Sequence, residues 1–360
     1  QVSESKKADA VIRYAYDERG RLETKILPGE KIYHYQYDQN FPEKISEVSL
    51  PSGKIIRYQY SASGQVIQKD VTLPDLRGKD RIFTLDFTYH RNQLASVTYP
   101  DGSRIDYSYD GSRLAEINWT KEPPKGWNKD TSSIIQYKPE LKSGRPPALV
   151  RALGNGLKET YQWNGAGQLQ DISVSHTTQA GGVELPITST HYTYEQGSNR
   201  IIREERSNTV RKGHILRKAD YRYDPAGRLE QHAISLDGKS ADRLSYRQFN
   251  KRDRIGEKDP ASINITGKEI LLTRDAFGNI NSRKIGEQTA EFIFNAENRL
   301  LKSLVREGRQ QEIATYDYDH LGERIEKTIE GESSTFYIDR FYEFTLARDG
   351  SMQETRYVWD

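Results

Sequence analysis

One four-residue word recurs along the whole chain, and it limits the possible folds more than any other feature. In most copies two aromatic residues, usually tyrosines, flank one other residue, and the word ends in aspartate or another polar residue; RQFN and LTRD are degenerate copies. Successive copies start 20 to 31 residues apart, except for 54 residues between Tyr107 and Tyr161. Such a period predicts a repeat architecture built from one supersecondary unit. The copies are YAYD at Tyr14, YQYD at Tyr35, YQYS at Tyr58, FTYH at Phe87, YSYD at Tyr107, YQWN at Tyr161, YTYE at Tyr192, YRYD at Tyr221, RQFN at Arg247, LTRD at Leu272, FIFN at Phe292 and YDYD at Tyr316.

Each position of the word has a physical role. Tyrosines two residues apart point to the same face of a strand and form a short ladder of rings. The aspartate that follows opens a turn, because its carboxylate can accept the backbone N–H two residues on. Glycine three residues later predicts a type I turn that ends in a left-handed residue. The clearest motif residues are Tyr14, Tyr16, Asp17, Gly20, Tyr35, Tyr37, Asp38, Tyr107, Tyr109, Asp110, Tyr221, Tyr223, Asp224, Gly227, Tyr316, Tyr318, Asp319 and Gly322.

A second turn often separates two copies of the word. These turns are hairpin signals between β-prone runs, so each repeat is predicted to hold two strands and two turns. No run of 11 or more residues has the apolar spacing of an amphipathic helix. The sequence therefore predicts an almost purely antiparallel β fold. The second turns include Pro51-Ser52-Gly53, Pro100-Asp101-Gly102, Gly154-Asn155-Gly156 and Asp237-Gly238.

A meander of this length cannot stay flat, because strand twist and bulges accumulate along it. Propeller blades have a longer and more uniform period, and insertions are expected here near 121–149 and 177–190. A spiral ribbon tolerates insertions because each hairpin needs only its neighbours. We therefore expect one continuous ribbon of repeats over residues 1–330, curling into a shell segment, with 331–360 leading into a further region. Both chain ends are interpreted as cuts out of a longer polypeptide.

Composition agrees with thin sheets that have large wetted faces. Apolar residues make up 34% of the chain and mean hydropathy is −0.86, yet 23 tyrosines, 10 phenylalanines and 4 tryptophans argue against disorder. The net charge of +2 gives no general attraction to nucleic acid or anionic membranes. The most basic run, Arg200 to Lys218, contains Glu204 and Glu205, so we interpret it as a solvated face rather than a phosphate site. No stretch approaches 18 apolar residues, so no membrane-spanning helix is expected.

The absence of cysteine excludes disulfides and thiolate metal sites, and it fits an exported bacterial protein. The words YRYDPAGRLE and YDYDHLGERIEKTI resemble the YD repeats of bacterial Rhs proteins and of the C component of Tc insecticidal toxin complexes, and more distantly those of the animal teneurins. The resemblance covers about Tyr14 to Ile329, and FYIDRFYEF resembles the stretch that precedes the Rhs-associated core. It implies a β-ribbon coiled into a hollow cocoon around a C-terminal toxic polypeptide.

No constellation of residues predicts catalysis, a cofactor or a metal. Asp317 and Asp319 could face one cation, but two carboxylates are few for a hard metal and Asp319 is assigned to a turn. Neither HExxH nor GxSxG occurs, and Gly154 and Gly156 are not followed by a helix that could bind phosphate. The sequons at Asn118 and Asn264 are uninformative. The histidines show no zinc-ligand spacing; they are His34, His90, His176, His191, His214, His232 and His320.

One short motif has a catalytic alternative. In the Rhs proteins that the chain resembles, Asp-Pro-x-Gly motifs near the end of the core belong to a self-cleaving aspartyl protease. Asp224-Pro225-Ala226-Gly227 matches this pattern, but it lies inside an ordinary repeat, and Asp259-Pro260 lacks the glycine. We interpret the first as a repeat turn.

Two functions from different classes remain. The first is a non-enzymatic structural segment of a secreted or cell-surface bacterial toxin shell. Its partners are the remainder of the shell, a C-terminal toxin cargo and a delivery-complex component. The second is an adhesion module that recognises a host-cell glycan or protein through its tyrosine-rich surface. A hydrolase is a distant third. We expect neither nucleic-acid binding nor a cofactor. Packing against neighbouring strands is the preferred role of the individual tyrosines.

Overall fold

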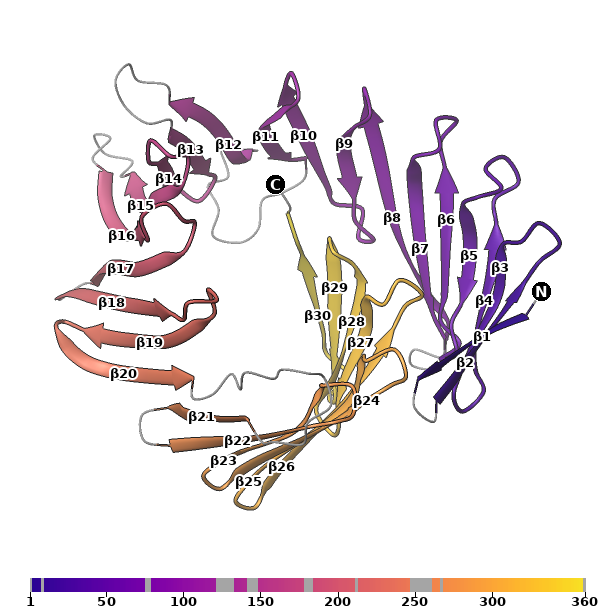
Figure 1. The fold of residues 1–360 in the computed structure, drawn as a ribbon. Coiled ribbons are helices and arrows are strands. Elements are labelled where there is room, and N and C mark those ends of the chain that lie inside the picture. The colour runs from indigo at the N-terminus through magenta and orange to yellow at the C-terminus, as the bar shows by residue number, and fades with distance from the viewer. Residues whose placement is uncertain are drawn as a thin grey trace. The chain divides into compact units, whose positions relative to one another are not determined.

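The computed structural model describes residues 2–7, 10–74, 79–120, 133–140, 148–177, 184–210, 213–246, 261–265 and 268–358. This part of the chain contains strands and turns but no helix, so none is present there that could span a membrane. The strands follow one another as antiparallel hairpins (Figure 1). The prediction of an antiparallel β-hairpin ribbon is confirmed. RQFN at Arg247, Asp259-Pro260, most of the insertion at 121–149 and residues 178–183 of the second insertion lie outside the described residues.

The chain divides into two compact units. Unit 1 contains residues 1–104 and 273–360, and unit 2 contains residues 105–272. Unit 1 thus combines two segments that are far apart in sequence. The boundary predicted at residue 330 marks the end of the repeat array, and it is a different kind of boundary from that between compact units. It stays a prediction.

Unit 1 is built from two segments of one long sheet, which we call the N-sheet and the C-sheet. Within each sheet, successive strands pair antiparallel in register with the next. The N-sheet comprises β1 (Val2–Lys7), β2 (Ala10–Tyr16), β3 (Leu22–Leu27), β4 (Lys31–Tyr37), β5 (Ile45–Ser49), β6 (Ile55–Tyr60), β7 (Val66–Leu73), β8 (Arg81–His90) and β9 (Gln93–Thr98). The C-sheet comprises β23 (Ile280–Ile285), β24 (Gln288–Phe294), β25 (Leu300–Glu307), β26 (Gln310–Tyr318), β27 (Arg324–Ile329), β28 (Ser333–Asp339), β29 (Tyr342–Ala347) and β30 (Met352–Arg356).

The core of unit 1 lies between these two sheets. Strand β8 shows why: Phe83, Leu85 and Phe87 are buried, whereas the residues between them are more exposed. The ring of Phe83 stacks on that of Phe344 in β29, with centroids 4.6 Å apart. In Figure 1 the yellow strands of the C-sheet accordingly stand beside the purple strands of the N-sheet.

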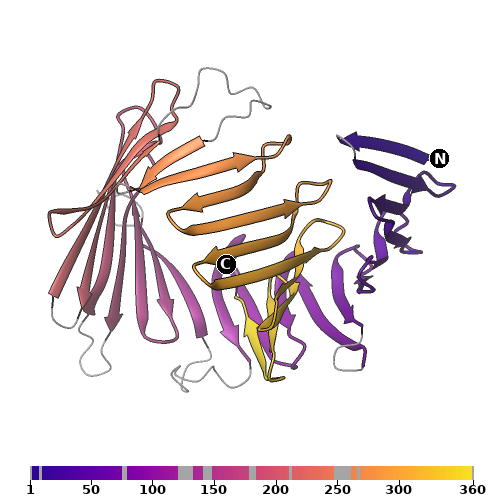
Figure 2. The same ribbon diagram turned by 90° about the horizontal axis from the view of Figure 1, so that it is seen from below.

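Unit 2 is a ribbon in which the described contacts join neighbouring or next-neighbouring strands. Its longest strands run side by side as one layer (Figure 2, left). The unit comprises β10 (Arg104–Asp110), β11 (Arg113–Trp119), β12 (Ser133–Glu140), β13 (Ala148–Leu153), β14 (Leu157–Trp163), β15 (Leu169–Thr177), β16 (Glu184–Tyr194), β17 (Ile201–Val210), β18 (Gly213–Tyr223), β19 (Leu229–Leu236), β20 (Lys239–Tyr246), β21 (Ala261–Ile265) and β22 (Lys268–Arg274).

Candidate functional site

The repeat turn has the predicted chemistry. The N–H of Gly20 donates to the carbonyl of Asp17 over 3.0 Å, and Gly20 has φ 77°. One carboxylate oxygen of Asp17 accepts the backbone N–H groups of Arg19 (2.9 Å) and Arg21 (2.8 Å). These bonds, that of Arg21 first, hold the pKa of Asp17 below its ordinary value. The motif thus closes one hairpin and returns the chain to the next strand.

The same turn recurs in other copies of the word. Asp224 accepts the N–H groups of Ala226 and Arg228, each over 2.9 Å, and Gly227 has φ 81°. Asp319 accepts those of the residues two and four positions on, also over 2.9 Å, and Gly322 has φ 90°. The turn interpretation of the Asp-Pro-Ala-Gly motif therefore accounts for the hydrogen bonds of its aspartate.

Two of the copies that end in aspartate depart from this geometry. Asp38 accepts the N–H of Asn40 over 2.8 Å, as predicted, but Phe41 stands where other copies have glycine. Asp110 is the last residue of β10 and pairs directly with Arg113, so its loop has only two residues. The physical reason is the glycine directly after Asp110, with φ 62°, which permits a tighter hairpin than the longer Asp-x-x-Gly turn.

The second tyrosine of the word ties neighbouring repeats together. The hydroxyl of Tyr37 donates to the carbonyl of Leu22, at the start of β3, over 2.9 Å. Tyr223 and Tyr318 make the same bond to a residue that begins a neighbouring strand, over 2.9 and 2.8 Å. Each hydroxyl thus satisfies a carbonyl just after the previous repeat turn, which is Asp-x-x-Gly only in the case of Tyr37. Tyr16, Tyr60, Tyr109 and Tyr194 occupy the corresponding position in other copies.

The first tyrosine of the word packs more deeply in some copies than in others. Tyr35 and Tyr107 are each 8% exposed, whereas Tyr14 is half-buried. Tyr221 stacks flat on a neighbouring histidine, and Tyr316 lies 3.1 Å from the hydroxyl of a serine. These contacts agree with the expected packing against neighbouring strands.

A cation after the turn extends the link to the next repeat. The guanidinium of Arg21 lies 4.3 Å above the ring of Tyr37 and donates over 2.7 Å to the carbonyl of Pro42 in the following turn. Arg299 repeats this arrangement, 5.8 Å above the ring of Tyr318. Successive turns therefore form a ladder held by hydrogen bonds and cation–π contacts.

Opposite charges line the contact between the N-sheet and the C-sheet, which we call the seam. The ammonium of Lys54 lies 2.7 Å from Asp317 and 2.8 Å from Glu326, and its side chain is only 6% exposed. Burial alone lowers the pKa of Lys54, but these two carboxylates outweigh it and raise the pKa above its ordinary value. Lys25–Glu297 (3.0 Å) is a second such pair.

A third pair, Lys69–Asp339, spans 2.6 Å. In all three cases the lysine belongs to the N-sheet side and the acid to the C-sheet side. The three lysines follow one another along the N-sheet segment in the same order as their acidic partners along the C-sheet segment. The seam therefore has a defined register. Lys54 and Asp317 are 263 residues apart in the sequence.

Aromatic rings complete the seam. His320 lies between the rings of Tyr35 and Tyr58, at centroid distances of 6.1 and 6.2 Å. Burial lowers the pKa of His320 below 6.5, and it raises the pKa of Tyr33 to about 12. A neutral histidine is therefore the state that fits this apolar stack.

Sequence reasoning missed the seam. Lys25 shares the inward face of β3 with Leu27, and Lys69 shares that of β7 with Val71. A lysine on the apolar face of a strand is a signal that an acid lies opposite, because an unpaired buried charge is costly. The signal does not identify the acid.

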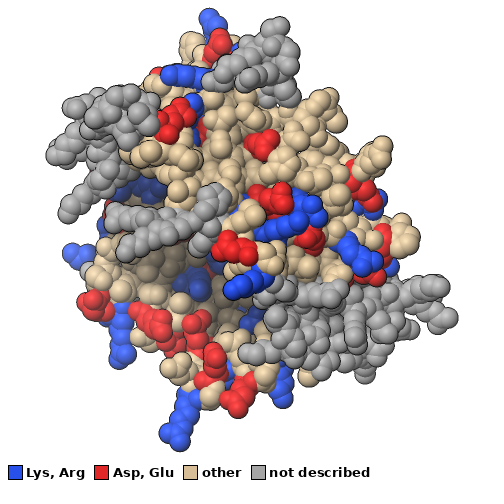
Figure 3. Space-filling model, turned by 90° about the vertical axis from the view of Figure 1, so that its left-hand side faces the viewer, with Lys and Arg blue, Asp and Glu red and all other residues tan. Residues whose placement is uncertain are grey.

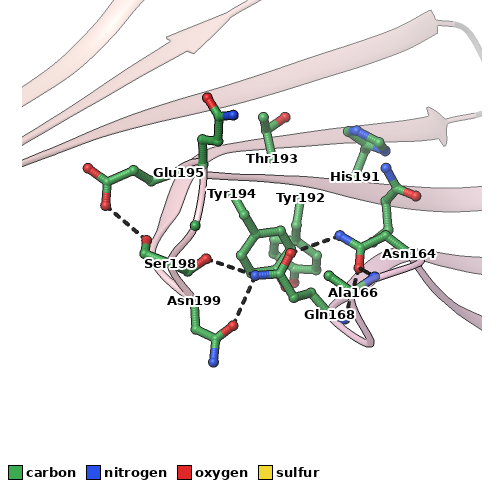
Figure 4. A pocket seen from close by; sticks show the side chains of 13 residues that line it. Asn164, Ala166, Gln168, His191, Tyr192, Thr193, Tyr194, Glu195, Ser198 and Asn199 are labelled. Atoms are coloured by element: carbon green, nitrogen blue, oxygen red, sulfur yellow. Dashed lines mark hydrogen bonds between the residues drawn. The ribbon is translucent and has the colours of Figure 1, made fainter.

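A polar groove of about 510 Å³ lies beside two repeat turns of unit 2. Figure 4 shows the side-chain amide of Gln168 in its centre, donating to the carbonyl of Ser198 over 2.8 Å and to the side chain of Asn199 over 2.9 Å. The side chains of Tyr192 and Tyr194 lie next to these amides in the same view. The groove can offer hydrogen bonds and ring faces to a polar ligand.

The basic run Arg200 to Lys218 is largely neutralised in the structure. Arg203 lies 2.7 Å from Asp220, and Arg217 lies 3.0 Å from Glu204 across the β17–β18 pair. Figure 3 shows blue and red side chains interspersed on the face it displays. These contacts favour the solvated face over a phosphate site.

No metal or catalytic cluster is found among the described residues. None of them form a group of three or more metal-ligating side chains. Asp317 pairs with Lys54, and Asp319 holds its own turn, so these two carboxylates do not share a cation site. His191 lies 2.6 Å from Asp171, but no hydroxyl in the described ranges completes a triad with this pair.

No protein-family model matches the chain. Among solved structures, the crystal structure of TcdB2-TccC3-Cdc42 matches 98% of this chain with a TM-score of 0.54 and 14% identity. The crystal structure of TcdB2-TccC3 matches 96% with a TM-score of 0.52 and 14% identity. The chain covers 21% of the length of each. The predicted resemblance to YD-repeat proteins of Tc toxin complexes is thus confirmed at the level of the fold.

A curated toxin is similar to part of the chain. The double-stranded DNA deaminase toxin A of Burkholderia cenocepacia (strain H111) is 29% identical over 113 residues. The match covers 30% of this chain and 8% of that protein. The chain therefore corresponds to a small part of each protein it resembles.

Proposed function

We propose that the chain is a structural segment of a bacterial YD-repeat toxin shell that encloses a toxic polypeptide carried on its C-terminal side. The observation that carries the proposal is the fold shared with the TcdB2-TccC3 chain over 98% of this chain. The partial likeness to a deaminase toxin supports the same class of protein. In this role the segment is secreted, has no catalytic activity, and assembles with the rest of the shell and with a delivery component.

The local chemistry supports a wall. Hairpins tied turn to turn make a continuous ribbon that needs no separate core for each repeat. The seam then holds one part of the ribbon against another by matched charges. A ribbon built in this way leaves edge strands that other parts of a shell must cover. The isolated segment is accordingly expected to self-associate in solution.

Protease protection tests enclosure. The complete protein that carries this segment is treated with a protease, beside its C-terminal polypeptide expressed alone. We expect the polypeptide to be cleaved when free and to resist cleavage in the complete protein. Protection should disappear in urea at the concentration that unfolds unit 1. Equal cleavage rates in both samples would refute the proposal.

The groove of Figure 4 favours a second candidate, recognition of a glycan. Amide side chains and tyrosine rings are suited to hydroxyl groups and to the flat faces of sugar rings. A glycan array tests this function with the chain itself, using Tyr192→Leu as the variant and Tyr161→Leu as the matched control. Saturable binding that only the first substitution removes would support recognition.

A further inference from the structure

A second pocket, of about 450 Å³, lies at the seam within unit 1. Its N-sheet side consists of the turn after β3, the start of β4 and the turn after β5. Its C-sheet side comes from the turn after β24 and from β25 and β26. This volume is within the usual range for small-molecule sites. The lining is mainly apolar and aromatic, and it includes Leu27, Pro28, Tyr33, Phe294, Leu301 and Tyr318.

The acidic and amide groups that line this pocket already have partners. The carboxylate of Asp317 accepts from the ammonium of Lys54 over 2.7 Å, a cation that it shares with Glu326. The side-chain oxygen of Asn295 accepts two backbone N–H groups of its own turn, each over 2.9 Å. The hydroxyl of Tyr33 donates to the carbonyl of Tyr318 over 3.3 Å. The one acid in this lining is therefore paired rather than free to bind a cationic ligand.

Lys31 is different. It lines the same pocket at the start of β4 and is exposed. Among the residues that the structure describes, none forms an ion pair with Lys31. The pocket thus combines an apolar interior with one uncompensated positive charge.

We propose that this pocket binds a small amphipathic carboxylate, with its apolar body among the rings and its anionic group at Lys31. Burial of the apolar body supplies most of the affinity, because it removes apolar surface from water. The ammonium of Lys31 selects the sign of the head group. A cationic amphiphile of the same length also buries its apolar body, but its head group is repelled by Lys31. This inference is independent of the shell function, because it requires only that unit 1 is folded.

Calorimetric titration of the chain with decanoate, decanol and decyltrimethylammonium tests the proposal. We expect decanoate to bind most tightly and the cation most weakly. Lys31→Gln should weaken decanoate binding about 2- to 5-fold, as expected for one exposed ion pair, and leave decanol unchanged. Lys31→Glu should reverse the order of decanoate and the cation. Because the side chain of Lys31 is exposed, neither substitution endangers the fold.

Leu301→Trp fills the pocket and should abolish binding of all three ligands. The matched control is Lys302→Gln, at the next position of β25, which faces away from Leu301 and should change nothing. Circular dichroism confirms that each variant is folded. The proposal is overturned if decanoate does not bind, if the Lys31 variants keep the wild-type order of ligands, or if folded Leu301→Trp binds as well as the wild type.

Discussion

The seam can be tested at Lys54, whose replacement by methionine keeps the length of the side chain and removes its charge. The ammonium of Lys54 is the described link between Asp317 at 2.7 Å and Glu326 at 2.8 Å. Without it, the two carboxylates, which are paired across the neighbouring strands β26 and β27, lose their shared counter-charge. Breaking a buried pair in this way costs about 3 to 5 kcal/mol. Because the two acids keep 32% and 23% of their side-chain surface exposed, we expect the lower end, about 3 kcal/mol.

Hydrogen exchange in β6 and β26 measures the effect locally, which avoids assuming that both units unfold together. A loss of about 3 kcal/mol corresponds to roughly a hundredfold faster exchange of the amides that open with the seam. Arg57→Gln is the control, because Arg57 pairs with Glu47 over 2.7 Å but has 44% of its side chain exposed. That pair should contribute less than about 1 kcal/mol.

Two further experiments test whether the contact of Lys54 is a buried ion pair. Replacing Lys54, Asp317 and Glu326 together by apolar residues of similar size should restore most of the protection, since no charge is then left unpaired. Added salt should weaken the Arg57 pair more than the buried one. If Lys54→Met accelerates exchange no more than Arg57→Gln does, the seam is not a buried electrostatic contact and this reasoning fails.

Three further outcomes can be measured by urea unfolding of the whole chain. Gly20→Ala should cost about 1 to 2 kcal/mol from its positive φ alone, and Gly322→Ala should cost slightly more, because its new Cβ would displace the flexible guanidinium of Arg299 from the ring of Tyr318; a smaller loss for Gly322→Ala would contradict this. Burial lowers the pKa of His320 below 6.5, so stability should fall as the pH drops below about 6.5, and His320→Phe should remove this component. Tyr37→Phe removes one bond between repeats and should cost about 0.5 to 1.5 kcal/mol; an unchanged midpoint would show that the ring alone holds the contact.

Local chemistry explains why so much of the ribbon was predictable. The turn at Asp17 depends on a carboxylate, a glycine and two N–H groups within five residues, and each of these can be recognised in the sequence. Asp110 shows the limit of pattern matching, because its word is a perfect YxYD copy. The glycine that follows it directly was the better guide to the two-residue loop.

The seam was not predictable for a different reason. The alternation of β8 shows that Phe83 points inward, but it does not show which strand lies opposite. The partner of Phe83 is Phe344, and this pairing depends on the total bend of the ribbon between the two residues. That bend is the sum of small contributions from every hairpin between them. A small change of twist in each repeat would bring another strand there. The periodicity of the sequence therefore shows which face of a strand is buried. Only the assembled structure shows which residues that face contacts.

The tyrosines of the repeat have different surroundings in the two units. Residues outside the four-residue word determine how polar those surroundings are. In unit 1, the inward face that carries Tyr35 is opposed by a second sheet, and neighbouring strands add large apolar residues such as Phe83. In unit 2, the corresponding ring of Tyr221 is half-buried. Arg217 on the same strand, β18, and Glu204 on the neighbouring strand, β17, share its face. Charged neighbours make such a face more polar than the inward face of unit 1. Under the proposed function, unit 1 closes the wall while unit 2 offers this polar tyrosine face to an enclosed polypeptide. Replacing Glu204 and Arg217 by leucine should then slow release of that polypeptide, and an unchanged release rate would place it elsewhere.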